Sequence, residues 1–177
     1  GISNPGPLSF VDVAFRDNDA VATPAGGQTG ALFVLAAGPL TLDRLRFEGN
    51  DAAEEGMQLW LQAGLSDPIS VQNVLFADGP THAMRVSTGA GTVRLGHLTA
   101  SGHSGAVILL QVASGPVLLD NSILWSNGAP LEPAGVAVVG PTNLIDVDPL
   151  FTDAVGGDYS LAAGSPAIDA GDATVAP

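Results

Sequence analysis

Four aspartates near the end of the printed sequence could bind a metal ion. Asp146, Asp148, Asp153 and Asp158 follow one another closely, and carboxylate oxygens are the ligands that Ca²⁺ prefers in proteins. An aspartate beside Pro or Gly more often accepts a backbone hydrogen bond in an Asx-turn, however. The sequence therefore favours Asx-turns for this set. Calcium is the one cofactor to test, and no other cofactor is predicted.

A second group of side chains could bind a sugar. Gln58, Trp60, Arg85 and Ser87 occupy corresponding positions in two consecutive copies of a repeated segment. An aromatic ring with hydrogen-bonding groups beside it suits the apolar face and the hydroxyls of a sugar. The alternative is that Trp60 packs beneath a loop, because tryptophan is mostly buried in folded proteins. The sequence favours this alternative over glycan binding.

No catalytic residues are predicted. The chain has no cysteine, which excludes a thiolate nucleophile, a thiolate metal site and a disulfide. His82, His97 and His103 fall at different places in the repeated units, so their rings are not expected to converge on one metal ion. The predicted site residues are therefore only those of the candidate sugar site and the candidate calcium site.

The four residues of the candidate sugar site belong to a repeated segment that begins with Gly or Ala and continues as a short strand. Its copies are residues 30–35, 56–61, 83–88, 105–110 and 135–139. A repeat of this length that is built of strands is typical of a solenoid, in which each repeat forms one coil. Strict alternation would turn the third and fifth residues of each copy outward. These residues are Leu32, Gln58, Arg85, Val107 and Ala137, followed by Val34, Trp60, Ser87, Leu109 and Val139.

This outward row is more apolar than a solvated sheet face should be. An apolar surface of this kind is normally covered, and the sequence leaves two covers open, the C-terminal segment of the chain or an intermolecular contact. The predicted partners are therefore a glycan or a protein on this face, with self-association as a further prediction.

A second motif alternates with the first and occupies residues 8–18, 40–50, 69–79, 93–103 and 117–127. Its first, third, sixth and eighth positions are mostly apolar, and its fourth and fifth are mostly polar, which indicates two short strands joined by a tight bend. Asn18, Asn50 and Asn127 recur at the end of the motif and predict a structural ladder between coils. We also expect Phe15 and the equivalent phenylalanines, Phe47 and Phe76, to stack in the interior.

Together the two motifs predict an all-β fold, a right-handed parallel β-helix of about five to six coils with a C-terminal cap. The predicted domain spans residues 1–177, with a lead-in at 1–7, coils at 8–142 and the cap at 143–177. In the cap, apolar side chains are expected to close the last open coil. These are Leu150, Phe151, Tyr159, Leu161 and Ile168.

The charge of the chain restricts its partners. Eighteen acidic residues against five basic ones give a net charge of −13, which disfavours nucleic acid, anionic lipid surfaces and anionic polysaccharides. No run of apolar residues is long enough to span a membrane.

The C-terminal sequence is more specific. Asp-Pro-Leu-Phe at 148–151, Gly-Asp-Tyr-Ser-Leu at 157–161 and Ser-Pro-Ala-Ile-Asp-Ala-Gly at 165–171 follow one another. This order resembles the terminal signature of bacterial right-handed parallel β-helix proteins of the surface-anchored, choice-of-anchor type. The resemblance implies an extracellular or cell-surface bacterial protein, mostly without an assigned activity. Because the first repeat is incomplete and no anchor follows Asp172, we expect the chain to be a piece of a longer protein.

Two functions are predicted from different classes. The first is a non-catalytic module that presents a surface for adhesion, assembly or glycan binding. The second is part of a polysaccharide lyase or a glycoside hydrolase of β-helix fold. Glycoside hydrolases use paired carboxylates, whereas lyases of similar architecture need an Arg or Lys base beside an acidic calcium cluster. Two or more carboxylates around Arg85 would favour the enzyme, so the surroundings of Arg85 discriminate between the two.

Overall fold

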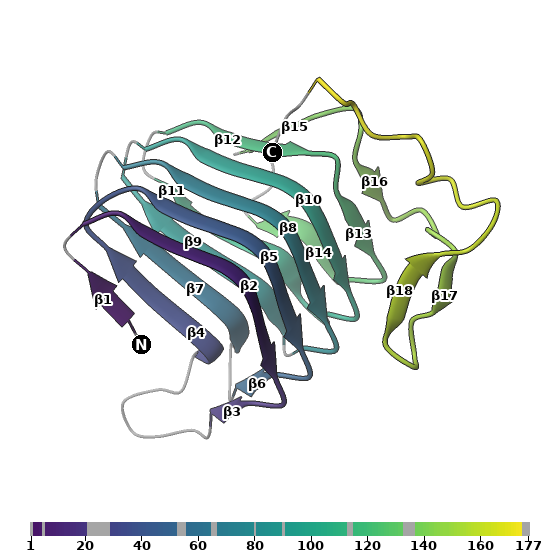
Figure 1. The fold of residues 1–177 in the computed structure, drawn as a ribbon, viewed down its shortest axis with the longest axis horizontal. Helices are drawn as coiled ribbons and strands as arrows, with labels where there is room; N and C mark the ends of the chain where they lie inside the picture. Colours follow the sequence, from purple (N-terminus) through teal and green to yellow (C-terminus); the bar gives the residue numbers. More distant parts are fainter. Residues whose placement is uncertain are drawn as a thin grey trace.

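The computed structural model describes residues 2–4, 6–20, 29–52, 56–64, 67–79, 81–89, 91–112, 115–132 and 137–174. Every regular element in these ranges is a β-strand, and the strands stack as parallel ladders in a β-solenoid (Figure 1). This confirms the predicted all-β parallel solenoid. The described part contains no helix that could cross a bilayer.

One face of the solenoid, called sheet A below, is a parallel sheet with one strand from each coil. Its six strands follow the coils in order (Figure 1). They are β1 (Ile2–Asn4), β4 (Thr29–Ala36), β7 (Met57–Ala63), β9 (His82–Thr88), β11 (Ala106–Val112) and β14 (Ala129–Glu132).

The second face, called sheet B, contains the longer strands. It runs through β2 (Leu8–Arg16), β5 (Leu40–Glu48), β8 (Ile69–Ala77) and β10 (Val93–Ser101) to β12 (Val117–Asp120), β13 (Ile123–Trp125), β15 (Ala137–Val139) and β16 (Leu144–Ile145). A short ladder joins β3 (Asp19–Ala20) to β6 (Asp51–Ala52). The stack has about four turns rather than five to six, because the strands at its two ends are short and incomplete.

Each long strand of sheet B bends at one left-handed residue, as the polar pair in the second motif predicted. The bend residues lie in register from coil to coil, so they form a column along the solenoid. Asp and Asn adopt the left-handed conformation more readily than most residues, which explains the polar pair at this place. The column contains Asp12, Arg44, Asn73, His97 and Asn121, with φ between 50° and 57°.

Aromatic rings stack in the interior as predicted. The ring centroids of Phe15 and Phe47 are 4.9 Å apart, and those of Phe47 and Phe76 are 5.0 Å apart, with nearly parallel planes. Phe47 and Phe76 are completely buried. Ala100 continues the column in the next coil, so the stack ends where the motif lacks a large side chain.

The predicted outward row of sheet A is wrong at several positions. Thr29 pairs with Met57 but Leu32 pairs with Leu59, so β4 contains one extra residue, and such a bulge reverses the faces that follow it. Leu32 and Val34 therefore point into the core.

Further along the same sheet, Gln58, Ala83 and Val107 lie in register and are fully buried, as are the residues that follow each of them. Strict alternation of buried and exposed residues therefore fails at the start of these strands, and Gln58 and Val107 do not face outward. The predicted orientation holds for side chains of sheet A that are at least partly exposed, which are Trp60, Arg85, Ser87 and Leu109. The copy predicted at 135–139 is wrong, because β15 pairs with β12 in sheet B and the last strand of sheet A is β14. The side chain of Ala137 lies outside the described part.

The C-terminal segment lies beside the coils. After β16, the antiparallel hairpin of β17 (Phe151–Asp153) and β18 (Asp158–Leu161) stands next to the outer face of sheet B (Figure 1). Leu150 and Ile168 are 41% and 48% exposed, and Leu161 is also exposed, so these three do not close the last coil as predicted. Phe151 and Tyr159 pack edge to face on each other, 5.2 Å between centroids.

Two attachments hold this segment against the side of the solenoid. The Tyr159 hydroxyl donates a hydrogen bond to Asp78 at 3.4 Å. Asn121 and the backbone of Asp172 exchange two hydrogen bonds of 2.9 and 3.0 Å. Because Asp78 follows β8 and Asn121 follows β12, the segment spans the flank of the stack.

Candidate functional site

A chain of amide and imidazole side chains runs inside the corner between sheet B and the following turn. Asn18 Nδ2 donates to Asn50 Oδ1 at 2.7 Å, and Asn50 Nδ2 donates to Gln58 Oε1 at 2.9 Å. Gln58 Nε2 lies 3.1 Å from His103 Nε2, and His103 Nδ1 lies 3.2 Å from Asn127 Oδ1. This confirms the predicted asparagine ladder and adds Gln58 and His103 to it.

Gln58 fills the place in the ladder that is left empty by Gly79, which has no side chain. Gly79 occupies the corner where other coils carry Asn, and a Cβ at Gly79 would collide with the Gln58 amide. The Gln58 amide also donates to the carbonyl of Ala77, much as Asn50 donates to the carbonyl of Phe15. Gln58 is 0% exposed, so its assignment to a ligand-binding surface is wrong, and its role is to complete the ladder.

The ladder determines the protonation state of His103. The Gln58 amide nitrogen can only donate, so His103 Nε2 must accept, and Nδ1 carries the hydrogen that is donated to Asn127. A charged imidazolium would place two donors against each other at Gln58. Burial, which the Asn127 hydrogen bond only partly offsets, lowers the pKa of His103 from 6.5 to about 4.

Substitutions at Gly79 and Gln58, singly and together, test the ladder. The place beside Gly79 that Gln58 fills is called the gap below. Gly79→Asn alone should destabilise the fold by about 1–3 kcal/mol through overpacking, and Gln58→Ala alone by about 1–3 kcal/mol because buried partners are left unpaired. The double variant restores one carboxamide to the gap, so we expect its cost to fall below the sum of the two by at least about 1 kcal/mol. Urea unfolding measures all three, and strict additivity would contradict the model of the gap.

On the outer face of sheet A, Trp60, Arg85 and Ser87 do come together. The Arg85 guanidinium lies over the Trp60 ring, 4.7 Å from its centroid, and Phe33 meets the same ring edge to face at 5.0 Å. The Trp60 Nε1 atom is buried, without a hydrogen-bond partner among the described residues. Since its neighbours occupy the ring and its polar atom is buried, Trp60 offers no open platform to a sugar.

The surroundings of Arg85 bear on the enzyme hypothesis. Its Nε donates to Gln111 Oε1 at 3.3 Å, and the Ser87 hydroxyl donates to the same oxygen at 3.3 Å. The ion pairs found among the described residues belong to three other arginines, Arg16, Arg44 and Arg46. No described carboxylate therefore pairs with Arg85, and the acidic cluster that a lyase requires is not seen around it.

Three of the four predicted calcium ligands serve turns. Asp148, Asp153 and Asp158 each accept a hydrogen bond from a backbone N–H two or three residues later, at 2.9–3.0 Å. The hydrogen bonds from Ser160 lower the pKa of Asp158. Across the described ranges, no group of three or more His, Asp or Glu side chains is arranged to hold a metal ion. Calcium binding at Asp146 and its neighbours stays a prediction.

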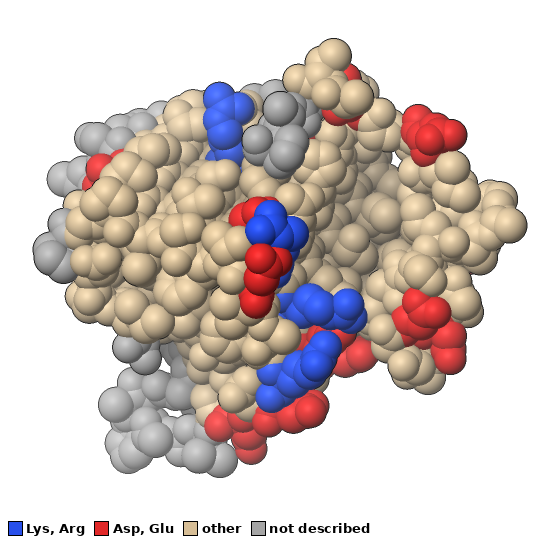
Figure 2. Space-filling view, viewed as in Figure 1, with Lys and Arg blue, Asp and Glu red and all other residues tan. Residues whose placement is uncertain are grey.

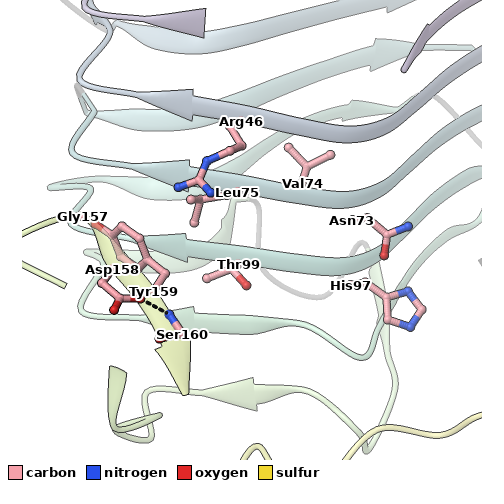
Figure 3. A pocket seen from close by; sticks show the side chains of 10 residues that line it. All are labelled: Arg46, Asn73, Val74, Leu75, His97, Thr99, Gly157, Asp158, Tyr159 and Ser160. Atoms are coloured by element: carbon pink, nitrogen blue, oxygen red, sulfur yellow. Dashed lines mark hydrogen bonds between the residues drawn. The ribbon is translucent and has the colours of Figure 1, made fainter. Parts of the chain in front are cut away.

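A hollow lies between sheet B and the C-terminal hairpin. This hollow, called the groove below, has a volume of about 380 Å³. Figure 3 shows Arg46, Asn73, His97 and Thr99 on strands of sheet B, with Tyr159 and Ser160 of the hairpin facing them. Three successive coils and the hairpin therefore contribute side chains to one concave surface.

The groove is polar and has few charged side chains among its described lining residues. Arg46 Nε is bound to Glu48 Oε1 at 3.1 Å, and Figure 2 shows arginines beside acidic side chains along this face. Among the described lining residues, Asp158 is the single carboxylate. Burial and the nearby Asp78 carboxylate raise the pKa of Tyr159 to about 12, so its hydroxyl stays protonated. Such a surface binds by uncharged hydrogen bonds and lacks the carboxylate pair of a glycoside hydrolase.

The sequence did not indicate this groove. It depends on a contact between Tyr159 and Asp78, which are 81 positions apart, and neither residue belongs to the repeated pattern of the other. The signal that could have pointed to it is the exposed polar side of the second motif. Arg46, Asn73 and Thr99 all lie at or just after the bend.

Comparison of the chain with family models, with curated proteins and with solved structures finds no match. The β-solenoid is therefore established by the structure alone. Membership of the surface-anchored group stays a prediction that rests on residues 143–172.

Proposed function

We propose that this chain is a non-catalytic module that binds a neutral glycan in the groove between sheet B and the C-terminal hairpin. The observation that carries the proposal is the composition of the groove. Amide, imidazole and hydroxyl groups from two coils and the hairpin line it together with one tyrosine ring. Sugar-binding sites combine such groups in a concave surface.

The charges support a neutral ligand rather than an anionic one. The chain has a net charge of −13, which repels anionic polysaccharides. Arg46 is the only described cation that lines the groove apart from the histidine, and it shares the Glu48 carboxylate with Arg16. The Asp158 carboxylate in the same groove would repel an anion, whereas the hydroxyls of a neutral sugar need no cation.

The location of the module is part of the proposal. The signature at residues 143–172 resembles that of extracellular and cell-surface bacterial β-helix proteins. A surface-displayed solenoid would serve adhesion or assembly by holding a glycan, and it would need no catalytic residues. The lyase and hydrolase alternatives lack a supporting carboxylate arrangement among the described residues.

A glycan array of neutral oligosaccharides, followed by calorimetry, tests the proposal. Thr99→Trp should fill the groove and reduce affinity at least about tenfold. Thr99→Val keeps the shape and a good strand former but removes the hydroxyl, so a loss of about 1 kcal/mol is expected. Trp60→Ala on sheet A is the control, and it should leave binding unchanged.

Two outcomes would contradict the proposal. Absence of binding to every neutral glycan on the array would remove it outright. If Trp60→Ala abolished binding and Thr99→Trp did not, the ligand would lie on sheet A instead, where the sequence first placed it.

A further inference from the structure

A second cavity continues the groove toward the end of the solenoid. Its volume is about 200 Å³, and His97 lines both hollows. In contrast to the groove, its wall is mostly apolar. The side chains that make it so are Ile123, Leu144, Leu161, Ala167 and Ala170.

Hydrogen bonds fix the wall of this cavity. Asn121, at the bend between β12 and β13, accepts from the N–H of Asp172 at 2.9 Å and donates to its carbonyl at 3.0 Å. These bonds tie residues 167–171, one wall of the cavity, to the coils that form the other wall. One wall of the cavity is therefore fixed by the contact of the C-terminal segment with the coils.

His97 joins the two hollows into one candidate site that has a polar part, the groove, and an apolar part, the cavity. Asn121 Nδ2 lies 3.3 Å from His97 Nε2, and Gln72 Oε1 lies 3.4 Å from His97 Nδ1, so the ring is held between them as a common wall. The groove and the apolar cavity therefore adjoin at the His97 ring. The cavity presents no charged side chain among its described lining residues.

We infer that the ligand is a neutral glycan that carries acyl groups, with its sugar hydroxyls in the groove and an acyl group in the apolar cavity. This inference rests on the proposed function. A sugar without the substituent would leave the apolar wall without contacts, and a purely apolar ligand would leave the polar groups of the groove unpaired. An N-acetyl or short O-acyl group fits both requirements.

Cellotriose and triacetylchitotriose form a matched pair of probes, because both are neutral β-linked trisaccharides and only the second carries N-acetyl groups. Calorimetry with the intact chain should give about tenfold or tighter affinity for the acetylated sugar, the discrimination typical of small apolar groups. Pairs of xylooligosaccharides with and without O-acetyl groups repeat the comparison.

Ala170→Phe is designed to fill the apolar cavity, and since Ala170 is exposed the new ring displaces no core residue. We expect this variant to lose the preference for acylated sugars and to retain the affinity for plain ones. Ala173→Phe, on an exposed residue outside the cavity, is the matched control and should keep the preference.

The outcomes separate the two proposals. Equal affinity for both members of every pair, or a preference that Ala170→Phe leaves intact, overturns the acyl inference while groove binding stands. Loss of both affinities in Thr99→Trp, with loss of only the preference in Ala170→Phe, supports both. If the unaltered chain binds no probe in either form, the proposed function fails, and the acyl inference fails with it.

Discussion

Phe47→Ala is expected to lower the free energy of unfolding by about 3–5 kcal/mol, the range for deleting a buried phenylalanine ring. Phe47 is completely buried and stacks on two rings, Phe15 at 4.9 Å and Phe76 at 5.0 Å. Its removal leaves a cavity between two rigid coils, which cannot collapse without breaking the ladders on both sides. Guanidinium unfolding followed by circular dichroism measures the loss.

The matched control is Phe15→Ala in the first coil. Phe15 is only partly buried and has one stacking partner, so its deletion exposes a smaller void that opens toward solvent. We expect this variant to cost at least about 1 kcal/mol less than Phe47→Ala. Equal losses, or a loss below about 1 kcal/mol for Phe47→Ala, would show that the phenylalanine column is not the centre of the core.

The second large effect is a loss of stability on acidification, centred on His103. The pKa of His103 falls from 6.5 in the unfolded chain to about 4 in the fold because the ring is buried. Between these values the unfolded state binds more protons, so the free energy of unfolding rises with pH. The stabilisation is complete above about pH 6.5 and is lost as the pH falls to about 4, and its full size is about 3 kcal/mol.

His103→Asn isolates this contribution because it places at the corner the residue that other coils carry. The variant should be nearly insensitive to pH between 6.5 and 4.5, whereas the unaltered chain should lose stability steadily. His82, which also lowers the pKa of His103, is present in both proteins. Carboxylates with lowered pKa, such as Asp12 and Asp158, act at lower pH and cancel in the difference. Parallel curves for the two proteins would contradict the assignment.

Much of the fold could be predicted from periodicity, since each coil repeats its neighbour. The polar pair in the second motif indicated the bend that the structure places at Arg44 and its equivalents. The phenylalanines at equal positions indicated the stack through Phe47. These features depend on spacing within one coil, and stacking then brings equal positions together.

The site depended on information that spacing does not contain. Trp60 and Arg85 were expected on the surface and do lie there together, but Gln58, two residues away, is in the interior. An irregularity of one residue turns the side chains that follow it to the opposite face of the sheet. The pattern of apolar residues does not show where such an irregularity lies. The sequence alone could not show that Gln58 fills the gap at Gly79.

The sequence by itself determined that this chain is a solenoid, where its strands bend and which rings form its core, because these are properties of a repeat. Only the tertiary structure decided where the C-terminal hairpin lies. That position rests on Tyr159 meeting Asp78 and Asp172 meeting Asn121, contacts between the repeat and a segment outside it. The groove and the apolar cavity exist because of these contacts, so they could not be predicted from the periodicity of the sequence.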